Sequence, residues 1–269
     1  MTEKEKQDIT REWEALMNQL YLLGYRNFNR ALKASIQPVL DAMEQSGSIL
    51  LVQELQAQLI SVVPIGAAMD RFVRFSGDKV AKNLWKTYRK YIPNNASVGV
   101  GFGAEKFALD MNEYLRTIGA QHIKDIDKTT RKLVKKAFED GLKEGDTLKQ
   151  VARRIERYTL GGLDGRINKR ARSLLIARTE TLMSAGRAKA AQIDEFEEVG
   201  VKFFKQWIHS AKVKEPRDDH KLANKTRRPK DGFWTFSGNK MRWAGDENGG
   251  TINNCNCRCS TIFVPIEEN

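Results

Sequence analysis

Apolar side chains recur at steps of three and four residues along the N-terminal part of the chain. The clearest stripe is formed by Ile9, Trp13, Leu16, Leu20 and Leu23. This spacing places the apolar side chains on one face of an amphipathic helix. We therefore predict a helix over about residues 5–45, bent or divided at Pro38 because proline lacks the N–H that a helix interior uses.

The helical period continues, with breaks, to about residue 196. Glycine and proline predict breaks at Gly47, within residues 93–103, at Gly145 and within residues 160–165. The periodic stretches between them predict helices over about residues 49–59, 69–88, 104–158 and 169–196. Thr147, placed three residues before Gln150, predicts a capping box at the start of the helix that contains Val151.

After Gly200 the pattern changes to short, aromatic, β-prone segments. We predict strands over residues 201–208 and 260–265, and a hairpin of residues 233–236 and 239–243 around Ser237-Gly238. The predicted fold class is α+β, with a mostly helical N-terminal two-thirds and a small antiparallel β-containing C-terminal domain.

The same pattern suggests three regions. Residues 1–98 form a helical region that is a candidate for docking, and residues 99–198 form a basic helical middle region. Residues 199–269 form the α+β end domain. The turn-rich, nearly uncharged residues 93–103 indicate the first boundary.

Composition narrows the class of protein. The 269 residues are 41% hydrophobic and 30% charged, as in a soluble globular protein. No apolar run approaches the roughly 18 residues of a membrane span, and the charged N-terminus lacks the apolar region of a signal peptide. Three cysteines do not make a disulfide scaffold, and no phosphate-binding G-x-x-x-x-G-K-[ST] loop occurs. We expect synthesis in the cytoplasm.

The formal net charge of +12 is informative about the expected binding partners more than about the fold. Basic residues three and four apart share a helix face that suits a phosphate backbone. The candidate DNA contacts are Arg131, Lys132, Lys135, Lys136, Arg153, Arg154, Arg157, Lys169, Arg170, Arg227 and Arg228. The alternative is a solvated helix exterior, since neighbouring acids such as Glu139 and Glu156 offset part of the charge.

The three cysteines permit two interpretations. On a strand, Cys255, Cys257 and Cys259 would share one face and, with His220, could form a Cys3His zinc site. The C-x-C-x-C spacing differs from the C-x2-4-C of structural zinc sites. We favour small buried cysteines at the start of the final strand, with no cofactor, and keep zinc as the alternative.

Several motifs occur in one order along the C-terminal half. They are A-R-T-E-T (177–181), R-x-x-H (217–220), D-x-F-W (231–234), G-x-x-x-R-W-x-G-D (238–246) and N-C-x-C-R-C (254–259). In this order they resemble the phage Mu protein F-like minor head proteins, a head-morphogenesis family of tailed phages. The first cysteine, Cys255, is outside the family's Cys-Arg-Cys pair.

The resemblance implies a non-enzymatic structural protein of the virion, associated with the portal protein in the capsid interior, near packaged double-stranded DNA and away from any membrane. It assigns structural roles to Arg178, Glu180, Arg217, His220, Cys257, Arg258 and Cys259. Two other functions stay open. One is a phage-encoded nuclease or zinc-dependent enzyme that uses His220 and the cysteines, and the other is a zinc-stabilised DNA-binding module.

Overall fold

The computed structural model describes residues 1–94, 96, 104–161, 171–210 and 216–266. The chain divides into two compact units, each assembled from stretches that are distant in sequence. Unit 1 comprises Met1–Tyr21, Val73–Tyr114 and Arg178–Asn269, and unit 2 comprises Leu22–Phe72 and Leu115–Ala177. Three long helices, α1 (Glu3–Ser46), α3 (Val63–Tyr88) and α7 (Ala171–Glu198), supply residues to both units. The predicted three-way division by function stays a prediction.

Unit 2 is helical, and most helix ends fall where the sequence predicts them. Besides its parts of α1, α3 and α7, it contains α2 (Ile49–Leu59), the π-helical η2 (Leu115–Gly119), α5 (Ala120–Glu144) and α6 (Leu148–Gly161). Gly145 ends α5 with a left-handed φ of 70°. The predicted capping box is present, since the Thr147 backbone N–H donates to Gln150 Oε1 at 2.8 Å.

The apolar stripes of α1, α5 and α6 close the core of unit 2. The buried cluster consists of Ile36, Val39, Met43, Val52, Ile60, Leu133, Val134, Ala137, Phe138, Val151, Ile155 and Tyr158. Pro38 does not divide α1, which continues to Ser46. The carbonyl that a proline leaves without a partner belongs to Ala34, an exposed residue, so water can bond to it.

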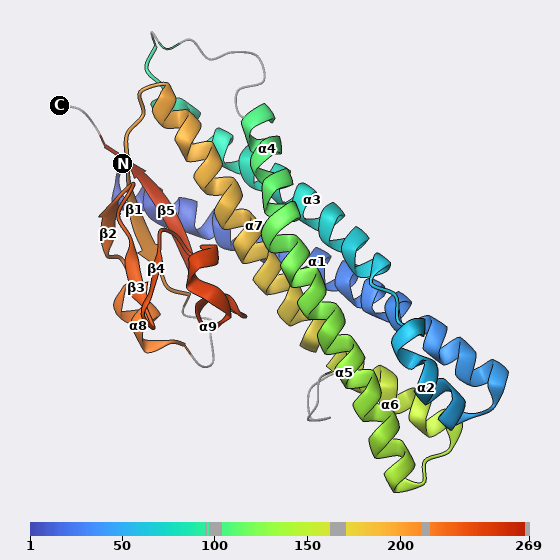
Figure 1. The fold of residues 1–269 in the computed structure, drawn as a ribbon. Coiled ribbons are helices and arrows are strands. Elements are labelled where there is room, and N and C mark those ends of the chain that lie inside the picture. Colours follow the sequence, from blue (N-terminus) through green and yellow to red (C-terminus); the bar gives the residue numbers. More distant parts are fainter. Residues whose placement is uncertain (95, 97–103, 162–170, 211–215, 267–269) are drawn as a thin grey trace. The chain divides into compact units, whose positions relative to one another are not determined.

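The strands found among the described residues, β1 to β5, all belong to unit 1 (Figure 1). β1 (Phe203–Ile208) lies between β2 (Arg227–Pro229) and β5 (Ser260–Pro265), antiparallel to both, and Phe203 pairs with Pro265. β3 (Trp234–Phe236) and β4 (Asn239–Met241) form the predicted hairpin. Its turn residues Ser237 and Gly238 have φ values of 48° and 80°, as a two-residue hairpin turn requires. The α+β class is therefore confirmed.

Helices cover the sheet of unit 1 through an aromatic core. Short elements complete the unit: η1 (Arg89–Tyr91), α4 (Ala104–Tyr114), α8 (Asp218–Leu222), η3 (Glu247–Gly249) and α9 (Gly250–Asn254). Tyr88 of α3 contacts Phe196 of α7 and Phe203 of β1, with ring centroids 6.0 and 5.4 Å apart. The Tyr88 hydroxyl also donates to the Phe263 carbonyl at 2.7 Å. The N-terminal helices are thus part of the core that supports the end domain.

Among the described residues, no single helix is both long and apolar enough to cross a membrane. Residues 49–59 and 63–91 meet that test only together, with a bend of 42° between them. The predicted boundary at residues 93–103 falls mostly outside the described residues.

Candidate functional site

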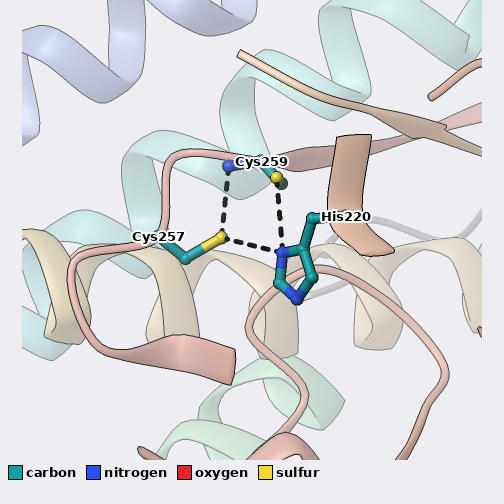
Figure 2. Close-up of side chains that lie close together, drawn as sticks. All are labelled: His220, Cys257 and Cys259. Carbon is teal, nitrogen blue, oxygen red and sulfur yellow. Dashed lines mark hydrogen bonds between the residues drawn. The ribbon is translucent and has the colours of Figure 1, made fainter. Parts of the chain in front are cut away.

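Three reactive side chains meet in the interior of unit 1 (Figure 2). His220 comes from α8, and Cys257 and Cys259 come from the segment between α9 and β5. Their exposed fractions are only 2%, 4% and 4%. His220 Nδ1 lies 3.6 Å from Cys257 Sγ and 3.6 Å from Cys259 Sγ. We call this group the His–Cys cluster.

Cys255 is excluded from the cluster by a turn. The segment is not a strand, because α9 ends at Asn254 and β5 begins only at Ser260. Asn256 adopts a left-handed φ of 55°, and the Cys257 N–H donates to the Asn254 carbonyl at 3.1 Å. The prediction that Cys255, Cys257 and Cys259 share one strand face is therefore wrong: Cys255 is partly exposed, whereas the other two face the interior.

Asn253 fixes the orientation of the histidine ring. Its side-chain N–H groups donate to the carbonyls of Phe236 and Gly249, at 3.1 and 2.9 Å. Its amide oxygen therefore faces His220 Nε2, 3.3 Å away. Because an amide oxygen only accepts, Nε2 carries a proton, and the Nδ1 lone pair of a neutral ring points at the two sulfurs.

The surroundings of the cluster are apolar. The Trp207 ring packs edge-on against the His220 ring, with centroids 5.3 Å apart, and the centroid of the Phe236 ring lies 4.3 Å from that of His220. Trp207 is fully buried and Phe236 nearly so. Water has little access, which strengthens electrostatic interactions among the three groups.

The two thiols differ in acidity. The hydrogen bond with Cys259 holds the pKa of Cys257 well below its ordinary value; His220 and the Cys259 backbone N–H, 3.4 Å from Cys257 Sγ, add to this against the effect of burial. The pKa of Cys259 is raised, first by its hydrogen bond to Cys257 and then by burial. The pair therefore favours one thiolate and one thiol.

Arg217, the first residue of the R-x-x-H motif, binds backbone and not an acid. Its Nε donates to the Ile252 carbonyl at 2.7 Å and its Nη2 to the Cys255 carbonyl at 3.0 Å. These bonds join the start of α8 to the end of α9. Arg217 and His220 consequently do not form an exposed acid–base pair, because Arg217 Nε and Nη2 donate to backbone carbonyls and the histidine is buried.

The A-R-T-E-T motif on α7 meets the cysteine segment through two of its residues. Arg178 Nη1 donates to Asn256 Oδ1 at 3.2 Å, and the Asn256 N–H donates to Thr179 Oγ1 at 3.1 Å. The pKa of Arg178 is lowered by burial and then by the nearby cation of Arg258. These bonds hold the left-handed turn that separates Cys255 from Cys257. The sequence analysis quoted Thr179 within the A-R-T-E-T motif without giving it a role, and it did not single out Asn256.

Glu180, to which the resemblance assigns a structural role, is buried and accepts a hydrogen bond from Tyr114. The donor–acceptor distance is 3.2 Å. Burial, and then the Glu180 charge, raise the pKa of Tyr114 well above its ordinary value. This bond joins α4 to α7 within unit 1.

Gly245 and Asp246, which end the G-x-x-x-R-W-x-G-D motif, also have a structural role. Gly245 has a φ of 89°, and a Cβ there would lie 2.5 Å from the Leu182 carbonyl of α7. Asp246 is fully buried and accepts from the Arg242 N–H at 2.7 Å and the Asn248 N–H at 3.0 Å. A glycine followed by an aspartate is the signal that could have identified this close turn.

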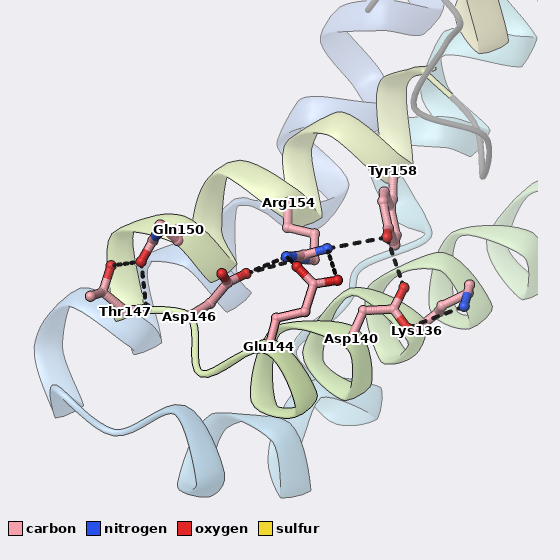
Figure 3. A network of polar contacts seen from close by, with 8 residues as sticks. All are labelled: Lys136, Asp140, Glu144, Asp146, Thr147, Gln150, Arg154 and Tyr158. Atoms are coloured by element: carbon pink, nitrogen blue, oxygen red, sulfur yellow. Dashed lines mark hydrogen bonds and ion pairs between the residues drawn. The ribbon is translucent and has the colours of Figure 1, made fainter.

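The predicted DNA-contact residues fall into two groups. Some bond other residues of this protein, and others are exposed to solvent. Arg154 is 9% exposed, and its guanidinium bonds Asp146, Glu144 and Tyr158 (Figure 3). We therefore correct its assignment: Arg154 is a structural residue of unit 2, because its donors are occupied away from solvent. We call this group, with Asp140, the Arg154 network.

Other predicted cations also have partners within unit 2. Arg131 bonds Asp127 and the Ile60 carbonyl, at 2.8 and 3.0 Å, and the Ala57 carbonyl. Lys136 and Lys135 face acids one turn away, Asp140 at 3.2 Å and Glu139 at 3.8 Å. Lys132, Arg153 and Arg157 are exposed. Lys169 and Arg170 lie outside the described residues.

Arg227 and Arg228 are exposed on β2, an edge strand of three residues that ends in proline. Charged residues and proline on an edge prevent pairing with other chains, so these arginines have a structural explanation beside the predicted DNA contact.

Comparison with known proteins agrees with the motif order. Residues 132–262 match the family model described as phage Mu protein F like protein. Searches of curated proteins and of solved structures gave no match. The matched range contains every residue of the His–Cys cluster, of the A-R-T-E-T motif and of the Gly245-Asp246 turn. Through residues 132–262 this chain therefore belongs to the phage Mu protein F-like family, a family of phage head-morphogenesis proteins.

Proposed function

We propose that this protein is a minor head protein of a tailed phage, a structural component that lies inside the virion head at the portal. The family match over residues 132–262 is the observation that carries the proposal. The protein would be made in the host cytoplasm and would reach the head during assembly.

The bonding of the motif residues supports a non-enzymatic role. A general acid or base must reach the proton that it transfers, yet His220 is 2% exposed. Asp219 is also bound, because its carboxylate accepts from the Ser237 N–H at 3.1 Å. Arg217 Nε and Nη2 bond backbone carbonyls as well, so the contacts of these motif residues support a role in stabilising the end domain.

Unit 2 exposes several large apolar side chains on α2 and just after it, which suits a protein partner. We define the α2 surface by Leu50, Leu51, Leu55, Val62 and Val63, which are 63%, 48%, 39%, 37% and 71% exposed. Apolar side chains gathered on one surface are typical of protein interaction sites. We propose that the α2 surface docks on the portal protein, which fits the predicted docking role of residues 1–98.

Packaged DNA is the second proposed partner. Lys132 on α5 and Arg153 and Arg157 on α6 are exposed cations that remain after the paired ones are removed. The net charge of +12 supports this contact, because cations that displace counterions from phosphates bind DNA without sequence preference.

Purified capsids test the proposal. We expect the wild-type protein to co-purify with capsids and to crosslink to the portal protein. Changing Leu50, Leu51 and Leu55 together to Ser should reduce incorporation roughly tenfold or more, since about 1.4 kcal/mol of lost contact weakens binding tenfold.

Leu109→Ser combined with Leu222→Ser is the matched control, because both leucines are exposed outside the α2 surface, at 64% and 81%. Absence of the wild-type protein from capsids would reject the proposed function. Normal incorporation of the triple variant, with all variants folded by circular dichroism, would reject only the docking surface.

A further inference from the structure

Two kinds of metal-binding atom meet inside unit 1, thiol sulfur and imidazole nitrogen. His220 Nδ1, Cys257 Sγ and Cys259 Sγ all lie within 4.8 Å of one another. The geometry points to a site for one Zn²⁺ ion, bound by these three atoms. This inference goes beyond the proposed function, and it departs from the packing role that the spacing of the cysteines favours.

The distances fit a bound ion. A tetrahedral zinc ion with bonds of about 2.3 Å to sulfur and about 2.0–2.1 Å to nitrogen holds those two ligand atoms about 3.6 Å apart. Both Sγ–Nδ1 distances are 3.6 Å. The limit of 4.8 Å on every separation also accommodates two bound sulfurs about 3.8 Å apart. The ligand atoms are therefore already at metal-binding spacing.

The hydrogen bond between the two cysteines does not explain why both sulfurs also lie at the same distance from His220 Nδ1. In its neutral form the His220 ring offers one lone pair, at Nδ1, because Asn253 accepts from Nε2. That lone pair accepts one proton, yet two sulfurs lie at the same distance from it. A metal ion bonds to the lone pair and to both sulfurs at once, so it uses all three groups.

The groups around the cluster match what a zinc site needs. A histidine ligand usually has its other ring nitrogen bonded to a fixed acceptor, the role that Asn253 Oδ1 fills here. The Cys259 N–H, 3.4 Å from Cys257 Sγ, stabilises a thiolate there. Two thiolates with one imidazole select zinc over magnesium or calcium, which prefer oxygen ligands.

The site lies beside a surface pocket, and an ion bound there would join two segments of unit 1. A surface pocket lined by Trp13, Met17, Tyr21 and Arg258 also includes Cys259 in its wall. The described residues supply three ligands, which leaves the fourth position of a tetrahedral ion to water or an added ligand. The ion would link α8, in the long connection between β1 and β2, to the segment that leads into β5.

Elemental analysis of the full chain tests the site. The protein would be expressed with zinc in the medium and freed of loosely bound metal by gel filtration. We expect one zinc ion per chain in the wild type, little or none in Cys257→Ser or Cys259→Ser, and the wild-type amount in Cys255→Ser. Equal zinc in all three variants would overturn the proposal.

Cobalt binding keeps the test decisive if the serine variants do not fold. Chelator-treated wild-type protein titrated with Co²⁺ should gain thiolate-to-cobalt charge-transfer absorption, and zinc should raise its melting temperature. No such absorption, together with a melting temperature unaffected by chelator or zinc, would contradict a metal site.

Asn253→Ala tests the positioning residue separately. Without the fixed acceptor we expect zinc affinity to fall about 10–100-fold, with the same stoichiometry at saturating zinc. Thr251→Ala, an exposed change on the same short helix, is the control. Unchanged affinity in Asn253→Ala would remove Asn253 from the site.

Discussion

The His–Cys cluster of unit 1 and the Arg154 network of unit 2 are both buried polar groups, and they differ in how their hydrogen bonds are completed. In the Arg154 network, the guanidinium and hydroxyl donors have acid or hydroxyl partners: Arg154 Nε lies 2.8 Å from Asp146, and the Tyr158 hydroxyl donates to Asp140 at 2.7 Å. In the His–Cys cluster, one lone pair faces two sulfurs. The Arg154 network is explained as structure because its donors have partners, whereas two sulfurs that converge on a single nitrogen lone pair indicate a binding site.

The two clusters also differ in the residue types that form them. Arg154 and its neighbours are ordinary surface residue types that the fold uses internally, with side chains of Arg154 and Asp146 only 10% and 11% exposed. The His–Cys cluster uses residue types that are rare in this chain, which has three histidines and three cysteines. Residue type therefore predicted function poorly for Arg154, where burial decided the role.

The largest expected effect comes from the cluster ligands. If zinc is bound, Cys257→Ser should cost more than about 4 kcal/mol of unfolding free energy, because metal-binding energy contributes directly to folding. If Cys257 only packs, the cost should be about 1–3 kcal/mol. Urea unfolding in the presence of zinc distinguishes the two values. Cys255→Ser should stay within about 0.5 kcal/mol of the wild type.

We expect Arg154→Met to cause a smaller but still large loss of unfolding free energy. Removing the guanidinium leaves the buried Asp146 carboxylate without its partner, which costs about 3 kcal/mol. The neighbouring Arg153→Met changes an exposed residue and should cost less than about 0.5 kcal/mol. Chemical denaturation of both variants checks this, and equal stabilities would show that the network does not stabilise unit 2.

The helical period of the sequence indicates that Arg154 lies on a buried face. It lies three residues after Val151 and four before Tyr158, so it shares the buried face of α6. Arg153 and Arg157, one turn apart, share the exposed face. Helical period therefore distinguishes the arginine that the fold uses from those left for a partner, and counting basic residues alone could not.

The strands show where prediction succeeds and fails. β5 and the hairpin were predicted because apolar β-prone runs and a Ser-Gly turn set their limits. β2 was missed, since three residues containing proline carry no strand pattern. The cysteine segment was predicted as strand, but the left-handed Asn256, held by Arg178 and Thr179 of a distant helix, makes it a turn. No local pattern encodes that tertiary contact, or the assembly of the two units.

DNA binding should depend on the exposed cations and not on Arg154. Changing Lys132, Arg153 and Arg157 to Gln should reduce the slope of log K against log salt by about 0.9 for each lost phosphate contact. Changing three exposed lysines elsewhere, Lys4, Lys33 and Lys79, is the control. Equal slopes in both variants, or no duplex binding at low salt, would remove DNA from the proposed partners.

The smallest effect concerns the edge of the Arg154 network. The pKa of Asp140 is lowered from its ordinary value of 3.8, and the hydrogen bond from the Tyr158 hydroxyl is the largest cause of this shift. The bond's contribution is therefore present above that pH and lost as the pH falls below it. Tyr158→Phe should cost about 1 kcal/mol near neutral pH, with the difference narrowing below about pH 4. A constant difference across this range would show that the bond is not to the carboxylate.

X-ray absorption at the zinc edge of the purified full chain tests the distinction between the two clusters most directly. We expect one zinc ion per chain with two sulfur neighbours at about 2.3 Å and an imidazole nitrogen at about 2.0–2.1 Å. The same spectrum is expected for Arg154→Met, since that network takes no part in the site. A spectrum with only oxygen and nitrogen neighbours, or zinc below stoichiometric amounts after growth in zinc, would contradict a metal site at His220, Cys257 and Cys259.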